Sequence, residues 1–326
     1  MRTLGIGLLM TAVAIAGCGG PDRQPAGGAA AGGAGTITVA FVTNNASDFW
    51  KIAQAGTEKA AGELGCDVLF KIPPQGTAQE QKQIVQDLIT RGVTGIAISP
   101  KDPENQTALL NETAAQVNLV TQDSDAPNSN RICYIGTDNY QAGVAAGELL
   151  KKSLPEGGEI MLFVGTLDAQ NAQDRKKGIE DTLQGSNITI IDTRTDETDR
   201  MKAKANAQDA ITTHPELDCL VGLWSYNGPA ILSGVRAAGK LGEVQIVCFD
   251  EEAETLQGVQ EGHIAGTIVQ QPFEFGYQSV KLLVELARGD RSRVPQDQRI
   301  IVPVKTITQD TVAEFWAQLK EQTGKS

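Results

Sequence analysis

From Thr36 onward the sequence alternates apolar runs of about six residues with amphipathic stretches of about 12 to 18 residues. This alternation is typical of βαβ units, in which helices join the strands of a parallel sheet. Ten strands are expected, which is more than one small sheet comfortably holds, so the pattern predicts an α/β protein with two similar lobes. The predicted strands span residues 36–42, 67–71, 95–98, 117–121, 132–135, 159–164, 188–192, 219–223, 245–249 and 265–269.

Residues 247–272 are predicted to form a strand, a helix and a second strand, with a polar residue at the end of each strand. One apolar run stops at Asp250, a polar helical stretch follows, and a second apolar run stops at Gln270, just before Pro272. The carboxyl ends of the strands in an open parallel sheet face the ligand crevice, so we expect Asp250 and Gln270 to point into one site. A carboxylate accepts hydrogen bonds, while an amide both donates and accepts them, which suits a ligand rich in hydroxyl groups.

The charge and composition of the chain limit its partners. With 326 residues, of which 40% are hydrophobic and 21% are charged, the chain has ordinary globular composition. That length suffices for two domains of about 130 to 150 residues. The net charge of -12 and the pI of about 4.7 disfavour a nucleic-acid partner, because an acidic surface repels phosphate.

Motifs for metal binding or catalysis are missing from the sequence. His214 and His263 are the two histidines, and neither accompanies a GxSxG or HExxH motif. Neither GxGxxG nor the P-loop pattern occurs, so we expect no enzyme activity, no catalytic residue, no cofactor and no metal. The cysteines of the predicted lobes lack CxxC spacing, so buried thiols are favoured and a disulfide stays open. They are Cys66, Cys133, Cys219 and Cys248.

The first 18 residues, MRTLGIGLLMTAVAIAGC, combine an early positive charge at Arg2, an apolar core and small residues before Cys18. This segment resembles a bacterial lipoprotein signal peptide, and the residues IAGC match its lipobox. The resemblance implies cleavage after residue 17 and lipidation of Cys18, with an uncleaved signal or a buried helix as the alternative. Residues 18–35 are rich in Gly and Ala and predict a flexible tether.

Six motifs in the rest of the chain resemble those of the substrate-binding proteins of sugar ABC transporters, in the ribose-binding group. The resemblance implies the type I periplasmic binding protein fold: two Rossmann-like lobes, three crossing segments, and a sugar held in the cleft between the lobes. The motifs are FVTNNASDFWKIAQAG, DLITRGVTGIAISP, TQDSDAP, YIGTDNYQAGVAAG, WSYNGPAILSGVRAAG and CFDEEAETLQGVQEGHIAGTIVQQPFEFG.

Four polar residues match ligand-binding positions of this family and also follow apolar runs: Asp123, Asn227, Asp250 and Gln270. Helix N-capping is the alternative role for the two aspartates, and a turn or cap role is the alternative for Asn227.

Aromatic residues are expected to pack against the sugar ring, whose C–H bonds form an apolar patch. Phe49 and Trp50 match an aromatic pair of the family, although one of the two could instead belong to the core. Ser47 stands where relatives often carry Asn. Trp224 and Tyr226 are further candidates, and we prefer Trp224 because it directly follows a predicted strand.

The chain also departs from the ribose-binding pattern. Ser124 and Gln173 are predicted to occupy positions where relatives carry arginine, and Asn171 or Arg175 could substitute for the missing donors. These departures favour a neutral hexose or polyol over ribose. Glu251 and Glu252 beside Asp250 argue against an anionic ligand, because like charges repel.

The resulting hypothesis is a lipid-anchored, monomeric receptor of the cell envelope that delivers a small neutral carbohydrate to the transmembrane subunits of an ABC permease. A sugar receptor for a sensor kinase or chemoreceptor is the alternative. A DNA-binding regulator is disfavoured because the residues before the lobes form the lipobox and tether. By alignment, residues 36–137 and 271–303 form the N-terminal lobe, and residues 138–270 and 304–326 form the C-terminal lobe. The expected hinge crossings are 137–138, 270–271 and 303–304.

Overall fold

The computed structural model describes residues 36–324. The predicted signal peptide, Cys18 and the tether lie outside the described residues. From Thr36 onward the chain forms one compact unit that contains two six-stranded sheets. The predicted α/β class with two mostly parallel sheets is confirmed, and every predicted strand overlaps an observed one.

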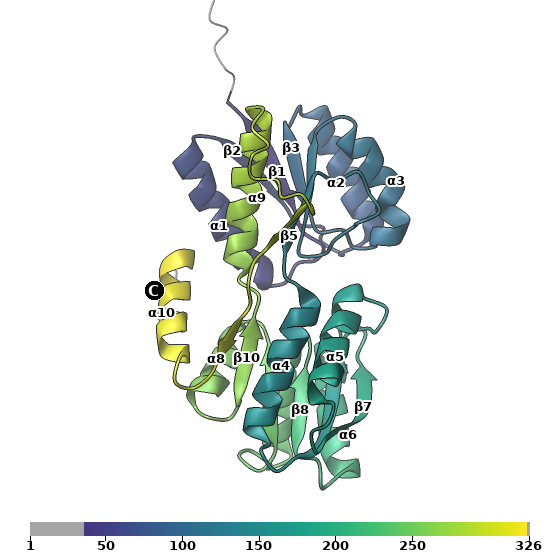
Figure 1. The fold of residues 1–326 in the computed structure, drawn as a ribbon, viewed down its shortest axis with the longest axis vertical. Helices are drawn as coiled ribbons and strands as arrows, with labels where there is room; N and C mark the ends of the chain where they lie inside the picture. Colours follow the sequence, from purple (N-terminus) through teal and green to yellow (C-terminus); the bar gives the residue numbers. More distant parts are fainter. Residues whose placement is uncertain (1–35, 325–326) are drawn as a thin grey trace, which may run out of the picture. The chain divides into compact units, whose positions relative to one another are not determined.

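The first sheet has the strand order β11-β5-β4-β3-β1-β2, and all of its neighbouring strands are parallel. Figure 1 labels β1, β2, β3 and β5 of this sheet. The order reverses between β1 and β3, which is where open α/β sheets form their ligand crevice. The strands are β1 (Thr38–Val42), β2 (Asp67–Lys71), β3 (Gly95–Ile98), β4 (Asn118–Gln122), β5 (Cys133–Gly136) and β11 (Arg299–Ile301).

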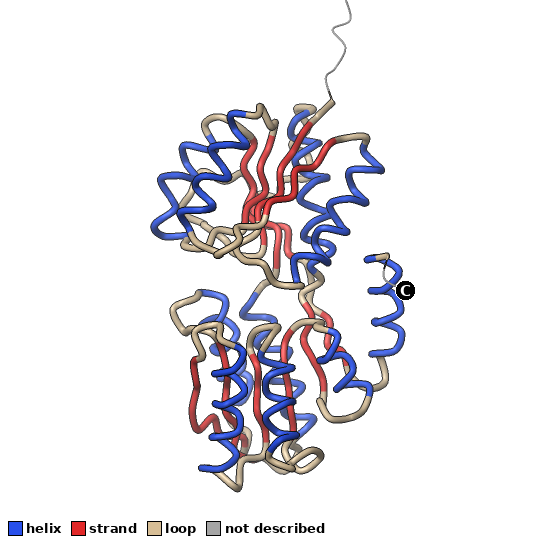
Figure 2. The backbone as a smooth tube through the Cα atoms, turned by 180° about the vertical axis from the view of Figure 1, so that it is seen from behind, coloured by secondary structure: helices blue, strands red, loops and turns tan. Residues whose placement is uncertain are grey.

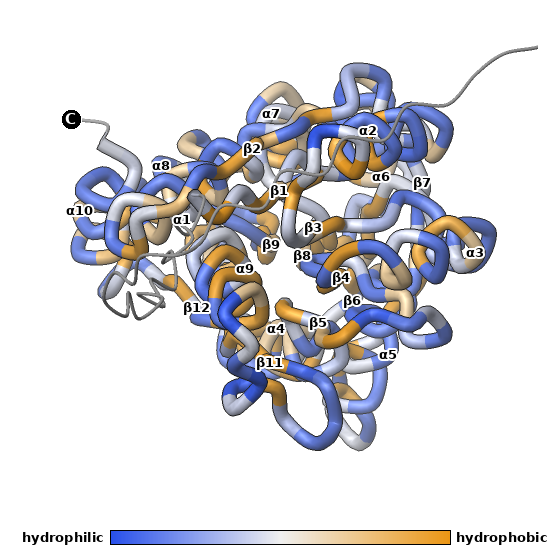
Figure 3. Tube along the Cα trace, turned by 90° about the horizontal axis from the view of Figure 1, so that it is seen from above, coloured by the Kyte–Doolittle hydropathy of each residue, from blue (hydrophilic) through white to orange (hydrophobic). Residues whose placement is uncertain are grey.

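Both faces of this sheet are covered by helices, so its strands are apolar on both sides. Val39 and Phe41 of β1 pack on the side of α1 (Phe49–Leu64) and α9 (Pro272–Ala287). The alternate residues of β1 pack on the side of α2 (Ala78–Thr90) and α3 (Pro103–Ala114). Figure 2 shows these strands between their helices, and Figure 3 shows hydrophobic residues gathered along β1, β4 and α9.

The second sheet repeats this strand order as β12-β10-β9-β8-β6-β7, and only its β10–β12 pair is antiparallel. Its strands are β6 (Gly158–Val164), β7 (Ile188–Thr195), β8 (Cys219–Gly222), β9 (Gln245–Phe249), β10 (Gly266–Val269) and β12 (Lys305–Ile307). The helices α4 (Asn139–Ser153) and α5 (Gln170–Leu183) share a core with one face. The other face packs on α6 (Arg200–Thr213), α7 (Asn227–Ala237), α8 (Ala253–Gln260) and α10 (Val312–Thr323).

The chain passes from one sheet to the other three times: between β5 and β6, between β10 and β11, and between β11 and β12. The hinge positions expected from the alignment lie within these intervals, and the lobe boundaries remain a prediction. The strands β11 and β12 are the two that the sequence pattern did not predict.

Two further features concern the described residues alone. Cys66, Cys133, Cys219 and Cys248 are all buried free thiols, as predicted. No helix between residues 36 and 324 combines the length and the apolar character that a membrane span requires.

Candidate ligand-binding site

Asp123 and Asp250 occupy equivalent positions in the two sheets, directly after β4 and just after β9. Both have left-handed backbone conformations, with φ of 58° and 70°. The backbone N–H of Asp123 donates to the carbonyl of Ile135 (3.2 Å), and that of Asp250 donates to the carbonyl of Ile268 (2.9 Å). Each aspartate is therefore held against the next strand of its own sheet.

A hydroxyl group from that next strand also fixes each aspartate. Tyr134 Oη shares its proton between the carbonyls of Asp123 (3.0 Å) and Thr137 (2.9 Å), and Thr267 Oγ1 donates to the carbonyl of Asp250 at 2.7 Å. Helix capping does not explain either residue, because Glu252 is the N-cap of α8 and α4 begins long after Asp123. Both carboxylates thus lie at the carboxyl edge of a sheet, where ligands of this fold class bind.

The side chain of Asp123 is held by two residues that the sequence reasoning missed. Ser99 Oγ donates to Asp123 Oδ2 at 2.8 Å, and Asn44 Nδ2 donates to the same oxygen at 3.3 Å. Ser99 follows β3, and Asn44 lies two residues after β1, so these strand ends meet at the reversal of strand order. Ser99 and Asn44 are polar residues that closely follow apolar runs, and this pattern was the sequence signal that could have identified them.

Asp250 and Gln270 are brought together as predicted. Both are 4% exposed, and Gln270 Nε2 donates to Asp250 Oδ1 at 2.8 Å. Within the described chain, Asp123 Oδ1 and Asp250 Oδ2 have no hydrogen-bond donor. Each carboxylate therefore keeps one oxygen that can accept hydrogen bonds from a ligand.

Arg175 supplies the cation of this cluster. Its side chain is 1% exposed; Nε donates to Asn139 Oδ1 at 2.9 Å, and one terminal N–H donates to the Leu223 carbonyl at 2.6 Å. The guanidinium also stacks over the Phe249 ring, 4.5 Å from its centroid. Burial lowers the pKa of Arg175, and the nearby carboxylates of Asp250 and Asp123 oppose that shift.

Residues from both sheets act on the protonation of Asp123. Burial raises its pKa from 3.8 to about 6, the Ser99 hydrogen bond and Arg175 lower it, and Asp250 raises it further. Burial also raises the pKa of Asp250, against the opposing effects of Arg175 and Gln270. Asp123 of the N-terminal lobe is therefore within electrostatic reach of Asp250 and Arg175 of the C-terminal lobe.

Glu251 adds a third buried carboxyl group beside this cluster. Burial and the neighbouring Asp250 raise its pKa well above its usual value, and Glu251 Oε2 is a buried atom without a hydrogen-bond partner. Glu252 is instead paired with Arg200, whose two terminal nitrogens donate to its carboxylate at 2.8 and 3.1 Å. Because the raised pKa favours the neutral form of Glu251 and Arg200 pairs with Glu252, the argument against an anionic ligand rests on Asp123 and Asp250.

The structure does not bring Gln173 to the two aspartates, and its alignment with an arginine position of the family stays a prediction. Gln173 is exposed, and its Nε2 donates to the Leu167 carbonyl at 2.9 Å. Arg175 lies two residues further along α5, about 200° around the helix, and it is the residue that faces the cluster.

Trp224 is a half-buried aromatic residue that lies two residues after β8. Its indole Nε1 donates to Asn171 Oδ1 at 3.2 Å, which gives Asn171 a supporting role. Asn227 is fully buried, and its Oδ1 accepts the backbone N–H of Trp224 at 3.0 Å. This is the turn role that the sequence left open for Asn227. Tyr226 is 9% exposed and donates its hydroxyl to Asp196.

The aromatic pair of the N-terminal lobe divides between two roles. Trp50 is 1% exposed and belongs to the core, where its ring meets Phe41 edge-on. The Trp50 site assignment is therefore replaced by the core alternative. Phe49 is half-buried and packs edge-on against Trp50.

Ser47 and Ser124 are the remaining predicted contacts. Both are half-buried, and the Ser47 backbone N–H donates to Asn45 Oδ1 at 2.9 Å. Ser124 directly follows Asp123, so it lies at the same sheet edge.

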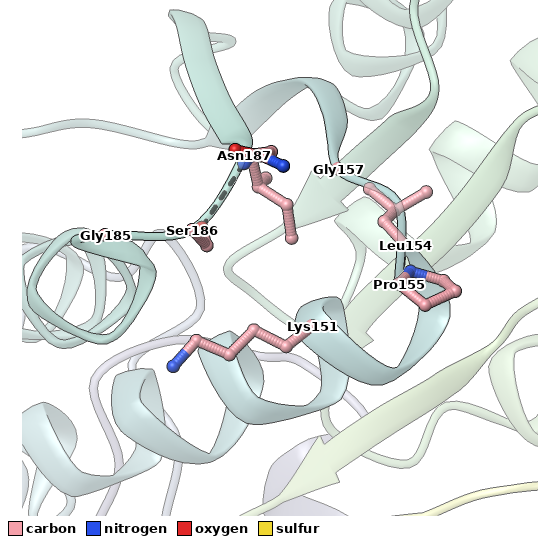
Figure 4. A pocket seen from close by; sticks show the side chains of 8 residues that line it. Lys151, Leu154, Pro155, Gly157, Gly185, Ser186 and Asn187 are labelled. Carbon is pink, nitrogen blue, oxygen red and sulfur yellow. Dashed lines mark hydrogen bonds between the residues drawn. The ribbon is translucent and has the colours of Figure 1, made fainter.

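A hollow of about 220 Å³ lies elsewhere on the C-terminal lobe (Figure 4). Pro155, Ser186 and Asn187 line it near the amino ends of β6 and β7, whereas ligand crevices form at the carboxyl ends. We therefore place the candidate site at the two aspartates. Among residues 36–324, no cluster of three or more His, Cys, Asp or Glu could hold a metal.

Comparison with known proteins agrees with this geometry. The model of the "Periplasmic binding protein domain" family matches residues 39–291. The chain is 24% identical over 272 residues to the ribose import binding protein RbsB of Salmonella typhimurium, covering 82% of this chain and 90% of that protein.

Solved structures show the same architecture. An ABC transporter solute-binding protein from Burkholderia graminis, in complex with D-arabinose, is 31% identical, with a TM-score of 0.79 over 84% of this chain and 96% of that one. GanP, a glucose-galactose binding protein from Geobacillus stearothermophilus, is 29% identical, with a TM-score of 0.78 over 84% and 98%. These relatives are sugar-binding proteins and not enzymes. The chain belongs to the periplasmic binding protein domain family.

Proposed function

We propose that the protein binds a small neutral sugar or polyol between Asp123 and Asp250 and delivers it to the permease of an ABC importer. The observation that carries this proposal is the pair of aspartates at equivalent positions, one at the carboxyl edge of each sheet and both in the left-handed conformation. Each retains one carboxylate oxygen for a ligand hydroxyl, and Arg175 offers a cationic group between them.

The charge of the cluster supports a neutral ligand. The carboxylates of Asp123 and Asp250 outnumber the single guanidinium of Arg175, so a phosphate or carboxylate on the ligand would be repelled. Hydroxyl groups suit the site because each donates to a carboxylate oxygen and accepts from an amide or guanidinium N–H.

Two half-buried aromatic residues complete the proposed site. Phe49 and Trp224 each follow the carboxyl end of a strand, one in each lobe. An aromatic ring there would cover the apolar C–H face of a sugar and exclude water from the hydrogen bonds around it. A site with one ring from each lobe is complete only when both lobes meet the ligand.

The choice among sugars rests on few groups. Similar proteins are named for ribose or for glucose and galactose, and one was solved in complex with D-arabinose. Because Arg175 provides one of the cationic donors, Ser124 alone is the departure that argues against ribose. We retain the hypothesis that a hexose or polyol binds more tightly than ribose.

A thermal-shift panel tests the ligand class. D-ribose, D-arabinose, D-glucose, D-galactose and xylitol are each added at increasing concentration, with D-ribose 5-phosphate and D-glucose 6-phosphate as matched anionic controls. A ligand at 100 times its Kd stabilises the native state by about 2.7 kcal/mol. We expect stabilisation by at least one neutral compound and by neither phosphate. Stabilisation by the phosphates alone would contradict the proposed ligand class.

Anchoring through Cys18 is a separate proposal, supported by the lipobox residues IAGC. In a bacterial host, Cys18→Ser should abolish palmitate incorporation and shift the protein to the soluble fraction, because the acyl chains hold it at the membrane. Sugar affinity should be unchanged, since Cys18 lies outside the lobes. Equal palmitate labelling of both proteins would rule out the lipoprotein assignment.

A further inference from the structure

We propose that Asp196 is a positioning residue of the sugar site, which fixes the ring of Trp224 through the amide of Asn227. The inference rests on the proposed function in one respect, namely that Trp224 lies against the ligand. Asp196 follows β7 and matches none of the residues to which the sequence or the family resemblance gives a role.

Asp196 is a fully buried carboxylate whose two oxygens are both engaged. Its Oδ1 accepts the Tyr226 hydroxyl and the backbone N–H of Thr198 (2.9 Å), and its Oδ2 accepts Asn227 Nδ2 at 3.0 Å. A buried charge is costly unless donors surround it, so three donors converging on one carboxylate indicate a specified arrangement. Burial raises the pKa of Asp196, and the same three hydrogen bonds oppose the shift.

The bond from Asn227 to Asp196 determines which way the Asn227 amide faces. With Nδ2 directed at the carboxylate, Oδ1 is directed at Trp224 and accepts its backbone N–H at 3.0 Å. The flipped amide would place its oxygen against the carboxylate and its NH₂ against the N–H of Trp224. Both contacts would then be repulsive, so the Asp196 carboxylate selects one orientation.

Trp224 is thereby fixed at three points. Asn227 holds its backbone N–H, Asn171 accepts from its indole N–H at 3.2 Å, and its six-membered ring lies on the backbone of Gly165. A Cβ at Gly165 would lie 2.1 Å from Trp224 Cζ3, so only glycine permits the ring to rest there.

The segment that carries Asp196 is tied to the same strand end. The backbone N–H of Asp196 donates to the Val164 carbonyl at 3.1 Å, and that of Glu197 donates to the Gly165 carbonyl at 2.8 Å. Glu197 and Thr198 both have left-handed conformations, with φ of 57° and 65°, which cost energy for residues other than glycine. The backbone under the Trp224 ring and the carboxylate that orients Asn227 are thus parts of one assembly.

Fluorine NMR of the full protein tests the inference without a ligand. The chain has three tryptophans, which 5-fluorotryptophan replaces, and the Trp224 signal is assigned by its loss in Trp224→Phe. In Asp196→Ala the Trp224 signal should move and broaden. The signal of Trp316, which lies on α10, should stay in place as an internal control.

Tyr226→Phe is the matched control variant. It removes another donor to the same carboxylate but retains the aromatic ring and the link to Asn227. The broadening seen in Asp196→Ala should therefore be absent from it. If Asp196→Ala does not fold, Asp196→Asn is used, because an amide cannot accept at both ends and must oppose one of its donors.

A double-mutant cycle tests the functional consequence with the tightest-binding neutral compound of the panel. Asp196→Ala should weaken affinity roughly tenfold in the native background, and less than about twofold when Trp224 is already alanine. An unmoved Trp224 signal in a folded variant, or an equal loss of affinity in both backgrounds, would overturn the inference. If the wild-type protein bound no panel sugar, the proposed function would fail, and the fluorine signals would still decide the role of Asp196.

Discussion

At the scale of single residues, the candidate site depends on two carboxylates whose positions lower the stability of the fold. Asp123 and Asp250 combine a left-handed backbone with a buried or half-buried side chain, and both features lower stability. Such a strained conformation persists when surrounding hydrogen bonds hold it in place. Here the hydroxyls of Tyr134 and Thr267 bond to the carbonyls of the two aspartates. The same features make each aspartate a strong acceptor for a ligand.

This arrangement predicts opposite pH dependences for stability and binding. The Asp123 pKa is about 6 in the folded protein and 3.8 ordinarily, so between these values the folded state binds more protons. The unfolding free energy of the unliganded protein should therefore fall as pH rises through this window, because the unfolded state binds fewer protons. Sugar affinity should rise over the same window, because the ionised carboxylate is the better acceptor.

Urea unfolding and calorimetric titration at pH 4.5, 5.5, 6.5 and 7.5 would measure both trends. Asp123→Asn should reduce both slopes, while the part due to Asp250, whose pKa is also raised, should remain. Parallel pH trends for stability and affinity would contradict the assignment of Asp123 as a ligand acceptor.

The aspartates and Gln270 were predictable because the rule that places them needs only the ends of apolar runs. Arg175 was named from the sequence as a substitute donor together with Asn171, but choosing between them requires the rotational register of α5. Trp50 and Phe49 are adjacent and similar in chemistry, and only packing shows that Trp50 is the core residue. Asn44 and Ser99 are polar residues that follow apolar runs, but their contact with Asp123 appears only when the strand ends meet in the fold.

At the scale of elements, glycines let pairs of helices cross closely in each lobe. Gly56 of α1 faces α9, where a Cβ would lie 2.0 Å from the Phe273 carbonyl oxygen. In the C-terminal lobe, a Cβ at Gly143 of α4 would lie 2.1 Å from the Arg175 carbonyl oxygen, and one at Gly178 of α5 would lie 2.2 Å from that of Tyr140. The α4–α5 crossing therefore sets the position of Arg175.

Gly178→Ala should accordingly destabilise the protein by about 1 to 3 kcal/mol, because the new methyl group forces the two helices apart. It should also weaken sugar binding by displacing Arg175. Gly62→Ala is the matched control, since Gly62 is an exposed residue of α1 with no atom within 4 Å of an added Cβ. This control should gain up to about 1 kcal/mol from helix propensity.

Urea denaturation and a sugar titration of both variants measure these effects. A loss of stability in Gly178→Ala no greater than in Gly62→Ala would show that the α4–α5 crossing is not as tight as described.

Most elements were predictable because the spacing of apolar residues in a long run distinguishes a strand from a helix. The strands β11 and β12 were not, because each has three residues and pairs with a strand distant in sequence. Their bounds are set by the partners β5 and β10, and a single-sequence pattern contains no trace of that pairing. The antiparallel direction of β12 follows from its position on the last crossing between the sheets.

At the scale of the whole molecule, two sheets of the same strand order each place an aspartate at their carboxyl edge, and Arg175 affects the pKa of both. A ligand that bonds to Asp123 and Asp250 together joins the two lobes. Binding and lobe closure are then expected to be linked, because the ligand stabilises the arrangement in which both aspartates reach it. Three chain crossings allow such a movement while keeping each sheet intact.

The most direct test is a calorimetric titration of the wild type, Asp250→Asn and Asp67→Asn with the tightest-binding neutral sugar of the panel. Asp67 is an exposed aspartate at the amino end of β2, away from the site, so its variant controls for the loss of a charge. We expect Asp250→Asn to lose about 2 to 4 kcal/mol of binding free energy while its unliganded stability is maintained, and Asp67→Asn to bind as the wild type does. Wild-type affinity retained by Asp250→Asn would contradict a sugar site between the two aspartates.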